Sequence, residues 1–227
     1  MDFVIPDTLL TWALIAVSLA NTILLLWLGI TLWLNADRRS LGIAVTAGGF
    51  LLGSLFFISH SALLLSDSLT FTRSNTLWLA VGITPVVILP FVWYVVLLWY
   101  AGYWTGPDNA LRRRHRLWLW LTGVTLLVGL GCLVLLGIPY VPIASGLSAW
   151  ISPLRRIVKT PLAGIPLLAL TYPLYVLVCV LLSLDALRRP GATARMLGDL
   201  ARRRAQPWLV AASILLLIVS LLVAAVL

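Results

Sequence analysis

The sequence contains no glutamate and a single lysine, Lys159, although it carries fifteen arginines and seven aspartates. Charged residues make up only 10% of its 227 residues, whereas a soluble domain usually has about a quarter. A nucleic-acid-binding domain needs a basic face on a folded soluble domain, and no polar segment of this chain is long enough to form one. We therefore interpret the net charge of +9 as a membrane-topology signal and expect no nucleic-acid partner.

Residues that hold cofactors and metals are also scarce. There are two histidines, His60 and His115, and two cysteines, Cys132 and Cys179. The histidines are expected at opposite membrane faces, which argues against a bis-histidine haem. Lys159 falls in a predicted loop, which excludes a retinal Schiff base. The sequence shows no Ser-His-Asp set, metal-ligand spacing or phosphate-binding loop, so we expect neither an enzyme nor a cofactor or metal site.

Apolar sequence, in contrast, is abundant: 62% of the residues are hydrophobic and the mean hydropathy is +1.07. Six apolar runs are long enough to cross a hydrocarbon core of roughly 30 Å. They are residues 9–34, 41–65, 76–105, 117–140, 162–184 and 208–227. The sequence thus predicts an all-α fold, a polytopic transmembrane helical bundle that forms one integral-membrane domain over residues 1–227.

The basic residues are unevenly divided between the loops that join these runs. The first, third and fifth loops hold twelve of them, and the second and fourth hold four. Basic loops are retained in the cytoplasm, so we expect a multi-pass protein of the inner (plasma) membrane with its N-terminus outside. The run that ends near Trp104 is rich in Trp and Tyr and precedes four clustered arginines, as expected for a helix that reaches the cytoplasmic interface.

Those four arginines, Arg112, Arg113, Arg114 and Arg116, are predicted to contact anionic lipid headgroups. Such a contact contributes about 1 kcal/mol per charge near the surface. The lipid bilayer and its anionic lipids are therefore the first expected partners.

The connection between the fourth and fifth runs has its own pattern. Apolar residues such as Leu147, Trp150 and Leu154 recur at helical spacing, and Arg155, Arg156 and Lys159 are its charged positions. This pattern predicts a short helix that lies in the membrane interface, starting near Ser152 because Pro153 favours a first helical position.

Polar side chains inside apolar runs are candidate functional residues because they are costly in a bilayer. His60, Thr84 and Tyr172 lie in the outer or middle zones of the second, third and fifth runs and form our candidate ligand-binding set. The alternative for His60 is a structural role, in which a neighbouring Ser or backbone carbonyl satisfies its ring. We expect Asp185 to pair with Arg188 or Arg189 at a helix end.

Several motifs resemble the seven-helix N-terminal membrane region of bacterial sensor histidine kinases. They are Asn35-Ala36-Asp37-Arg38-Arg39 before Gly48-Gly49, Leu89-Pro90-Phe91-Val92-Trp93-Tyr94, Leu98-Trp99-Tyr100-Ala101-Gly102, Asp185-Ala186-Leu187-Arg188-Arg189-Pro190 and Gly198-Asp199-Leu200-Ala201-Arg202-Arg203-Arg204. In that family the membrane region is the input module, and cytoplasmic signalling domains follow it. This chain departs from the family in having six spans and no kinase segment.

The resemblance implies a membrane-embedded sensory or receptor-like input module of a bacterial two-component signal-transduction protein, without a catalytic output domain of its own. The alternative is an accessory integral-membrane subunit that packs within a larger complex, so other membrane or signalling proteins are expected partners. A transporter is disfavoured because we find no internal repeat between the two halves. We further expect either a truncated seven-span module or a six-span derivative, which does not autophosphorylate.

Overall fold

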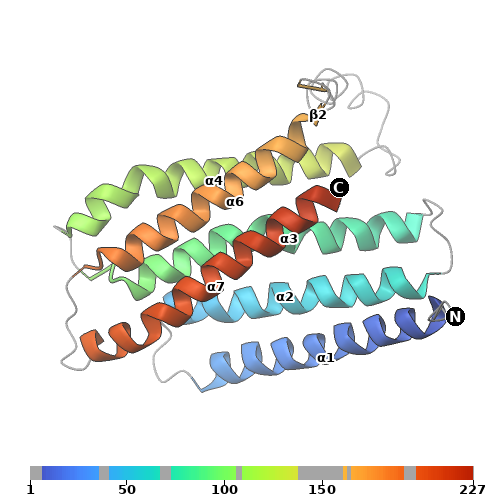
Figure 1. The fold of residues 1–227 in the computed structure, drawn as a ribbon, viewed down its shortest axis with the longest axis horizontal. Helices are drawn as coiled ribbons and strands as arrows, with labels where there is room; N and C mark the ends of the chain where they lie inside the picture. Colours follow the sequence, from blue (N-terminus) through green and yellow to red (C-terminus); the bar gives the residue numbers. More distant parts are fainter. Residues whose placement is uncertain are drawn as a thin grey trace, which may run out of the picture. The chain divides into compact units, whose positions relative to one another are not determined.

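The computed structural model describes residues 7–35, 41–66, 73–105, 109–137, 161–162, 165–191 and 198–226. Six long helices account for nearly all of these residues (Figure 1): α1 (Asp7–Leu34), α2 (Leu41–Leu65), α3 (Arg73–Tyr100), α4 (Ala110–Gly137), α6 (Leu167–Arg188) and α7 (Gly198–Val226). Each contains a stretch that is long and apolar enough to cross a membrane. The predicted all-α polytopic fold is confirmed, and the chain is a multi-pass membrane protein.

Two short strands, β1 (Pro161–Leu162) and β2 (Ile165–Pro166), pair in antiparallel fashion just before α6. Helix α6 follows these strands and begins at Leu167, whereas the fifth span was predicted to begin at residue 162. The predicted interfacial helix of residues 147–159, with its start near Ser152, lies outside the described residues.

The helices also differ from the predicted spans at their basic ends. Helices α4 and α7 begin at Ala110 and Gly198, whereas the spans were predicted to begin at residues 117 and 208. Arginine is among the better helix formers, so the arginine clusters belong to the first turns of these helices instead of to loops. The third span was predicted to run to residue 105, but α3 ends at Tyr100 because a glycine turn follows it.

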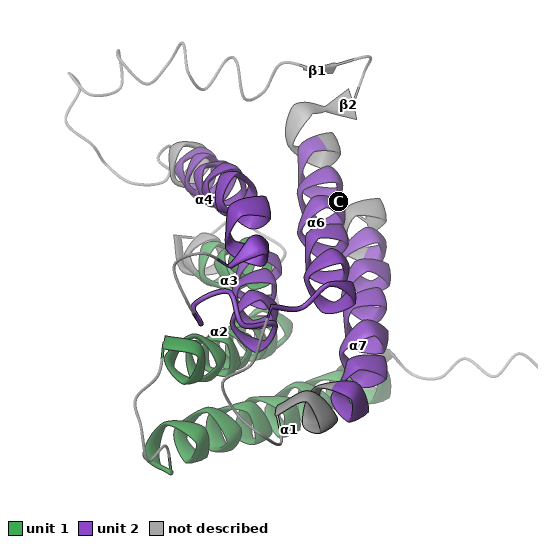
Figure 2. Ribbon diagram, turned by 90° about the vertical axis from the view of Figure 1, so that its left-hand side faces the viewer, with its two compact units in different colours: residues 1–89, 137–142 green, residues 90–136, 143–227 purple. Residues whose placement is uncertain are grey.

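The chain divides into two compact units, residues 1–89 with 137–142 and residues 90–136 with 143–227 (Figure 2). In the first unit, α1 and α2 run side by side, and Gly29 of α1 lies close to α2. A Cβ atom there would lie 3.3 Å from the carbonyl oxygen of Ala47 and from Leu51. Small residues permit such close packing of membrane helices. On α2, Gly53 faces the Leu25 side chain, whereas Gly48 faces open space.

The second unit contains the last part of α3 together with α4, α6 and α7. Its core is a cluster of fully buried side chains from α3 and α6, including Tyr94, Leu98, Val176 and Val180. Trp93 of α3 donates its indole N–H to Ser213 of α7 over 2.9 Å. The outer faces carry large exposed apolar side chains, such as those of Trp120 and Trp208, as expected for surfaces that meet lipid.

Candidate functional site: the basic end of the second unit

The end of α3 is fixed by a glycine turn. Gly102 has a φ of 88°, a left-handed conformation that glycine adopts without a steric penalty. Its N–H donates to the Trp99 carbonyl over 3.0 Å, and the N–H of Tyr103 donates to the Leu98 carbonyl over 2.9 Å. These two bonds define a Schellman motif. The buried Leu98 and Tyr103 side chains belong to the same apolar cluster, so the motif both ends α3 and anchors the turn in the core.

Asn109 joins this turn to the next helix. Its side-chain oxygen accepts the N–H of Leu111 over 3.0 Å, which caps the N-terminus of α4. Its amide nitrogen donates to the Gly102 carbonyl over 2.7 Å. The segment after α6 is bound to the same turn, because the N–H of Gly191 donates to the Ala101 carbonyl over 2.8 Å. The ends of α3, α4 and α6 are thus tied together by the backbone and one asparagine.

A network of four polar side chains, Tyr94, Arg114, His115 and Asp185, lies next to these turns; we call it the polar joint. His115 is fully buried, with 0% of its surface exposed. Its Nδ1 atom is 2.8 Å from the Tyr94 hydroxyl oxygen, and its Nε2 atom is 3.2 Å from Oδ2 of Asp185. The imidazole ring therefore connects α3 to α6 from its position on α4.

One assignment of the hydrogens satisfies each member of the joint at these distances. The Nε atom of Arg114 lies 2.8 Å from Oδ2 of Asp185 but 3.4 Å from Nε2 of His115. Its N–H therefore donates to the carboxylate, which leaves the His115 Nε2–H free to donate to the same oxygen. The Nδ1 atom then accepts the hydroxyl hydrogen of Tyr94, and both ring nitrogens are satisfied in the neutral tautomer.

Arg114 also contacts the C-terminus of α6. Its Nη2 atom lies 3.5 Å from the Asp185 carbonyl oxygen and 3.4 Å from the Arg189 carbonyl oxygen. A cation at this position satisfies exposed carbonyls and complements the negative end of the helix dipole. We had expected Asp185 to pair with Arg188 or Arg189; its partners are Arg114 and His115 instead, because packing of α4 against α6 brings them closer.

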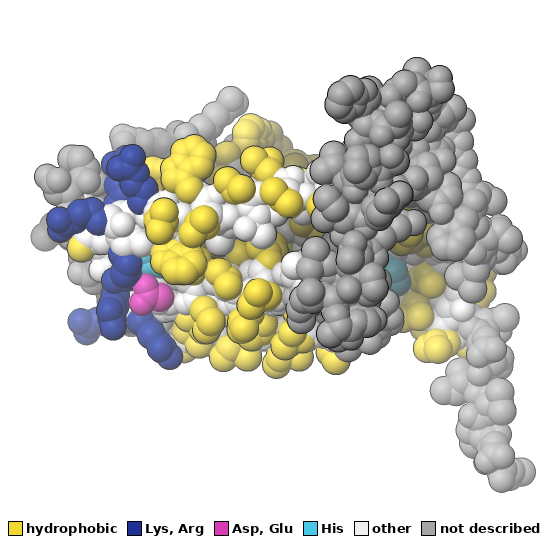
Figure 3. Space-filling model, turned by 90° about the horizontal axis from the view of Figure 1, so that it is seen from above, with side chains coloured by type: hydrophobic (Ala, Val, Ile, Leu, Met, Phe, Trp, Pro, Cys, Tyr) yellow, Lys and Arg dark blue, Asp and Glu magenta, His cyan; other side chains and the backbone are white. Residues whose placement is uncertain are grey.

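The four arginines predicted to bind lipid headgroups divide into two groups. Arg112, Arg113 and Arg116 are exposed, whereas Arg114 is turned inward to the joint. Figure 3 shows arginine side chains gathered at one end, with an acidic side chain among them and apolar side chains along the flank. Three of the four therefore remain available for headgroup contact.

The candidate ligand-binding residues are distributed over both units. In the first unit, Nδ1 of His60 lies 2.8 Å from the Ser18 hydroxyl, so a serine does satisfy the ring, and Phe56 stacks beside it. The Thr84 hydroxyl donates to the Ala80 carbonyl of its own helix over 2.8 Å. Tyr172 belongs to the second unit, where it packs against the buried cluster. The contact with Ser18 is consistent with the structural role for His60, and the ligand set stays a prediction.

His115 and Tyr94 were not among the predicted site residues, because His115 lies within an arginine cluster that was predicted to be a loop. A helical pattern was nevertheless available. Leu111, His115 and Thr122 are four and seven residues apart, and all three are buried on one face of α4, while Arg112 and Arg116 are exposed. An i, i+4 pattern of this kind places His115 on the packed face.

The joint has the chemistry of a structural or switching network. Within the described part of the chain, no group of three or more His, Cys, Asp or Glu side chains lies close enough to hold a metal ion. Comparisons with protein-family models, with curated proteins and with solved structures gave no match for this chain.

Proposed function

We propose that this protein is a sensory or receptor-like input module embedded in a bacterial inner membrane. In this proposal the N-terminus lies outside and the arginine-rich end of the second unit faces the cytoplasm. The excess of arginine at that end supports the orientation, because basic residues are retained on the cytoplasmic side. Two motifs that carry the resemblance to sensor kinases, residues 98–102 and 185–190, contribute to this end of the unit.

The observation that carries the proposal is the polar joint. A fully buried histidine is costly within a membrane bundle and is seldom present without a role, and the partly exposed Asp185 is its carboxylate partner. Here they connect helices α3, α4 and α6 at one membrane face. A displacement of any of these helices would break the contacts of His115 or Asp185, and in this proposal that break is the switching event. Such a joint suits a module that passes a signal to a cytoplasmic partner.

The alternative is an accessory subunit of a larger membrane complex. The observation in its favour is the extent of large apolar side chains on the outer faces, among them Trp12, Trp27 and Trp208, which are each more than 60% exposed. Aromatic residues are enriched at the contacts between proteins as well as at lipid interfaces.

Site-specific photo-crosslinking in the native host distinguishes a sensory module from an accessory subunit. A photoreactive residue at Arg113, which is exposed at the basic end, is compared with one at Trp120, which is exposed further along the same helix. A sensory module is expected to crosslink from position 113 to a protein with cytoplasmic signalling domains, and Asp185→Asn is expected to change the yield. A stable stoichiometric complex captured from position 120, with no signalling partner at 113, would establish the accessory subunit.

A further inference from the structure

A small cavity lies at the basic end of the second unit, where the ends of α3 and α6 meet the start of α7. Its volume is about 220 Å³, below the roughly 300–1,000 Å³ of pockets that enclose drug-sized ligands. Its lining residues are Tyr100, Ala101, Leu187, Arg188, Pro190, Arg203 and Gln206. The cavity can therefore enclose a small chemical group, and the rest of a larger ligand would lie outside it.

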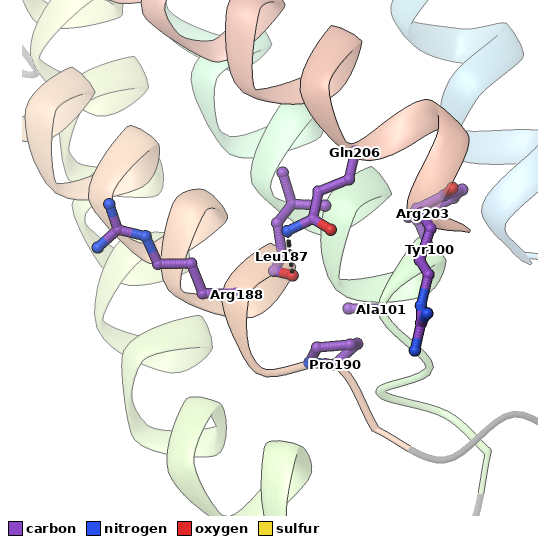
Figure 4. Close-up of a pocket in the computed structure, with 7 residues that line it drawn as sticks. All are labelled: Tyr100, Ala101, Leu187, Arg188, Pro190, Arg203 and Gln206. Carbon is purple, nitrogen blue, oxygen red and sulfur yellow. Dashed lines mark hydrogen bonds between the residues drawn. The ribbon is translucent and has the colours of Figure 1, made fainter. Parts of the chain in front are cut away.

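The polar groups of the cavity come mainly from α7. Figure 4 shows the Arg203 side chain extending along one wall, past Tyr100 toward the level of Pro190, while the Arg188 guanidinium points away on the other side. The Gln206 amide nitrogen donates to the Leu187 carbonyl over 3.3 Å. Because that nitrogen carries two hydrogens, one remains available to a ligand. Arg203 and Gln206, one helical turn apart, thus present donors to the same cavity.

The charge around the cavity is positive. Arg188, Arg189, Arg203 and Arg204 are all exposed on the neighbouring ends of α6 and α7. Asp185, at the end of α6, is already engaged by Arg114 and His115. An anion is therefore the group that this surface attracts, and a guanidinium with a nearby amide suits phosphate oxygens.

Apolar surface begins immediately beside the cavity. Trp208 lies two residues after Gln206 and is 78% exposed, and further exposed apolar side chains such as Leu215 follow along α7. A ligand with an anionic head and an apolar tail can occupy both surfaces at once. Basic pockets between transmembrane helices on the cytoplasmic side are a known arrangement for lipid headgroups.

We propose that this cavity binds the phosphate group of an anionic phospholipid, with Arg203 as the principal cation, Gln206 as a second donor, and the acyl chains along α7 beside Trp208. The site differs from the surface contacts expected of Arg112, Arg113 and Arg116. We expect the same lipid site whether the chain is a sensory module or an accessory subunit.

The test measures phospholipid retained by the purified full chain in detergent, by native mass spectrometry, with added phosphatidylglycerol or phosphatidylcholine. The wild type is expected to retain phosphatidylglycerol in preference to phosphatidylcholine. Arg203→Gln should lower phosphatidylglycerol binding about tenfold, the loss expected for one charge-assisted hydrogen bond. Gln206→Leu removes the second donor and should also weaken binding.

Arg204→Gln is the matched control, because it removes the same charge from the adjacent exposed position, which does not line the cavity. It should change binding by no more than about twofold, since the cavity keeps its own donors and only the screened field changes. Equal losses in the Arg203 and Arg204 variants, or equal retention of the two lipids, would overturn the proposal. Displacement of phosphatidylglycerol by millimolar inorganic phosphate would overturn the lipid assignment and identify a free phosphate ion as the occupant.

Discussion

Arg114 and Asp185 are 71 residues apart in the chain, yet Nε of Arg114 lies 2.8 Å from Oδ2 of Asp185. The same guanidinium faces the last carbonyls of α6. One side chain from the start of α4 therefore meets both the carboxylate and the negative end of the α6 dipole. His115, the next residue, uses the same carboxylate and adds Tyr94 of α3. The polar joint thus holds three helix ends at one membrane face.

Removal of the Tyr94 hydroxyl should destabilise the second unit. Tyr94→Phe leaves Nδ1 of the buried His115 without its partner, at a cost of about 1–3 kcal/mol. Tyr175→Phe is the control, because its buried hydroxyl has no well-formed hydrogen bond among the described residues and lies near the weakly polar Cys179 thiol and the Phe91 backbone. That variant should be neutral or slightly more stable. Thermal unfolding in detergent measures both, and equal destabilisation by the two substitutions would contradict the role assigned to Tyr94.

A side chain at Gly102 should destabilise the second unit. Gly102→Ala forces a Cβ atom into a left-handed conformation, with a φ of 88°, and should lower the free energy of unfolding by about 1–2 kcal/mol. Gly131→Ala is the matched control, since a Cβ atom there meets nothing within 4 Å, and it should be near neutral. Comparable stability of the two variants would mean that the Schellman motif does not fix the end of α3.

The sequence was sufficient to predict the helices because hydropathy reports length and apolar content directly. It was not sufficient for their basic ends. A hydropathy window ends at a run of arginines, although the arginines of α4 continue the helix. The partner of Asp185 could not be predicted from the sequence either. Arg188 and Arg189 are its neighbours in the chain, whereas Arg114 comes close to it only through the contact between α4 and α6. His115 could have been placed correctly from its spacing with Leu111.

We expect His60 to stabilise the contact between α1 and α2 through its hydrogen bond with Ser18. His60→Ala and Ser18→Ala remove the two ends of the same 2.8 Å hydrogen bond, so each should cost about 1 kcal/mol. The double substitution should cost less than the sum of the two. Thermal unfolding of the single and double variants provides the measurement. If neither substitution changes stability, His60 is free to serve the predicted ligand set with Thr84 and Tyr172.

The orientation follows from the distribution of arginine and is tested by reporter fusions. A reporter enzyme that is active only in the periplasm should be active when fused after Asp67, because the connection from α2 to α3 is followed by a single arginine, Arg73, at the start of α3. The same reporter should be silent after Asn109, which directly precedes the basic end of α4. Activity in the reverse pattern would place the N-terminus inside and the polar joint at the outer face.

The polar joint is tested most directly by a double-mutant cycle on Arg114→Gln and Asp185→Asn. The free energy of unfolding is measured in detergent for the wild type, both single variants and the double variant. The two side chains are 33% and 38% exposed, so solvent screens the pair, and we expect a coupling energy of about 1 kcal/mol. Arg113→Gln, at an exposed position beside Arg114, should show no coupling to Asp185→Asn. Strictly additive effects of Arg114→Gln and Asp185→Asn would contradict a joint that ties α4 to the end of α6.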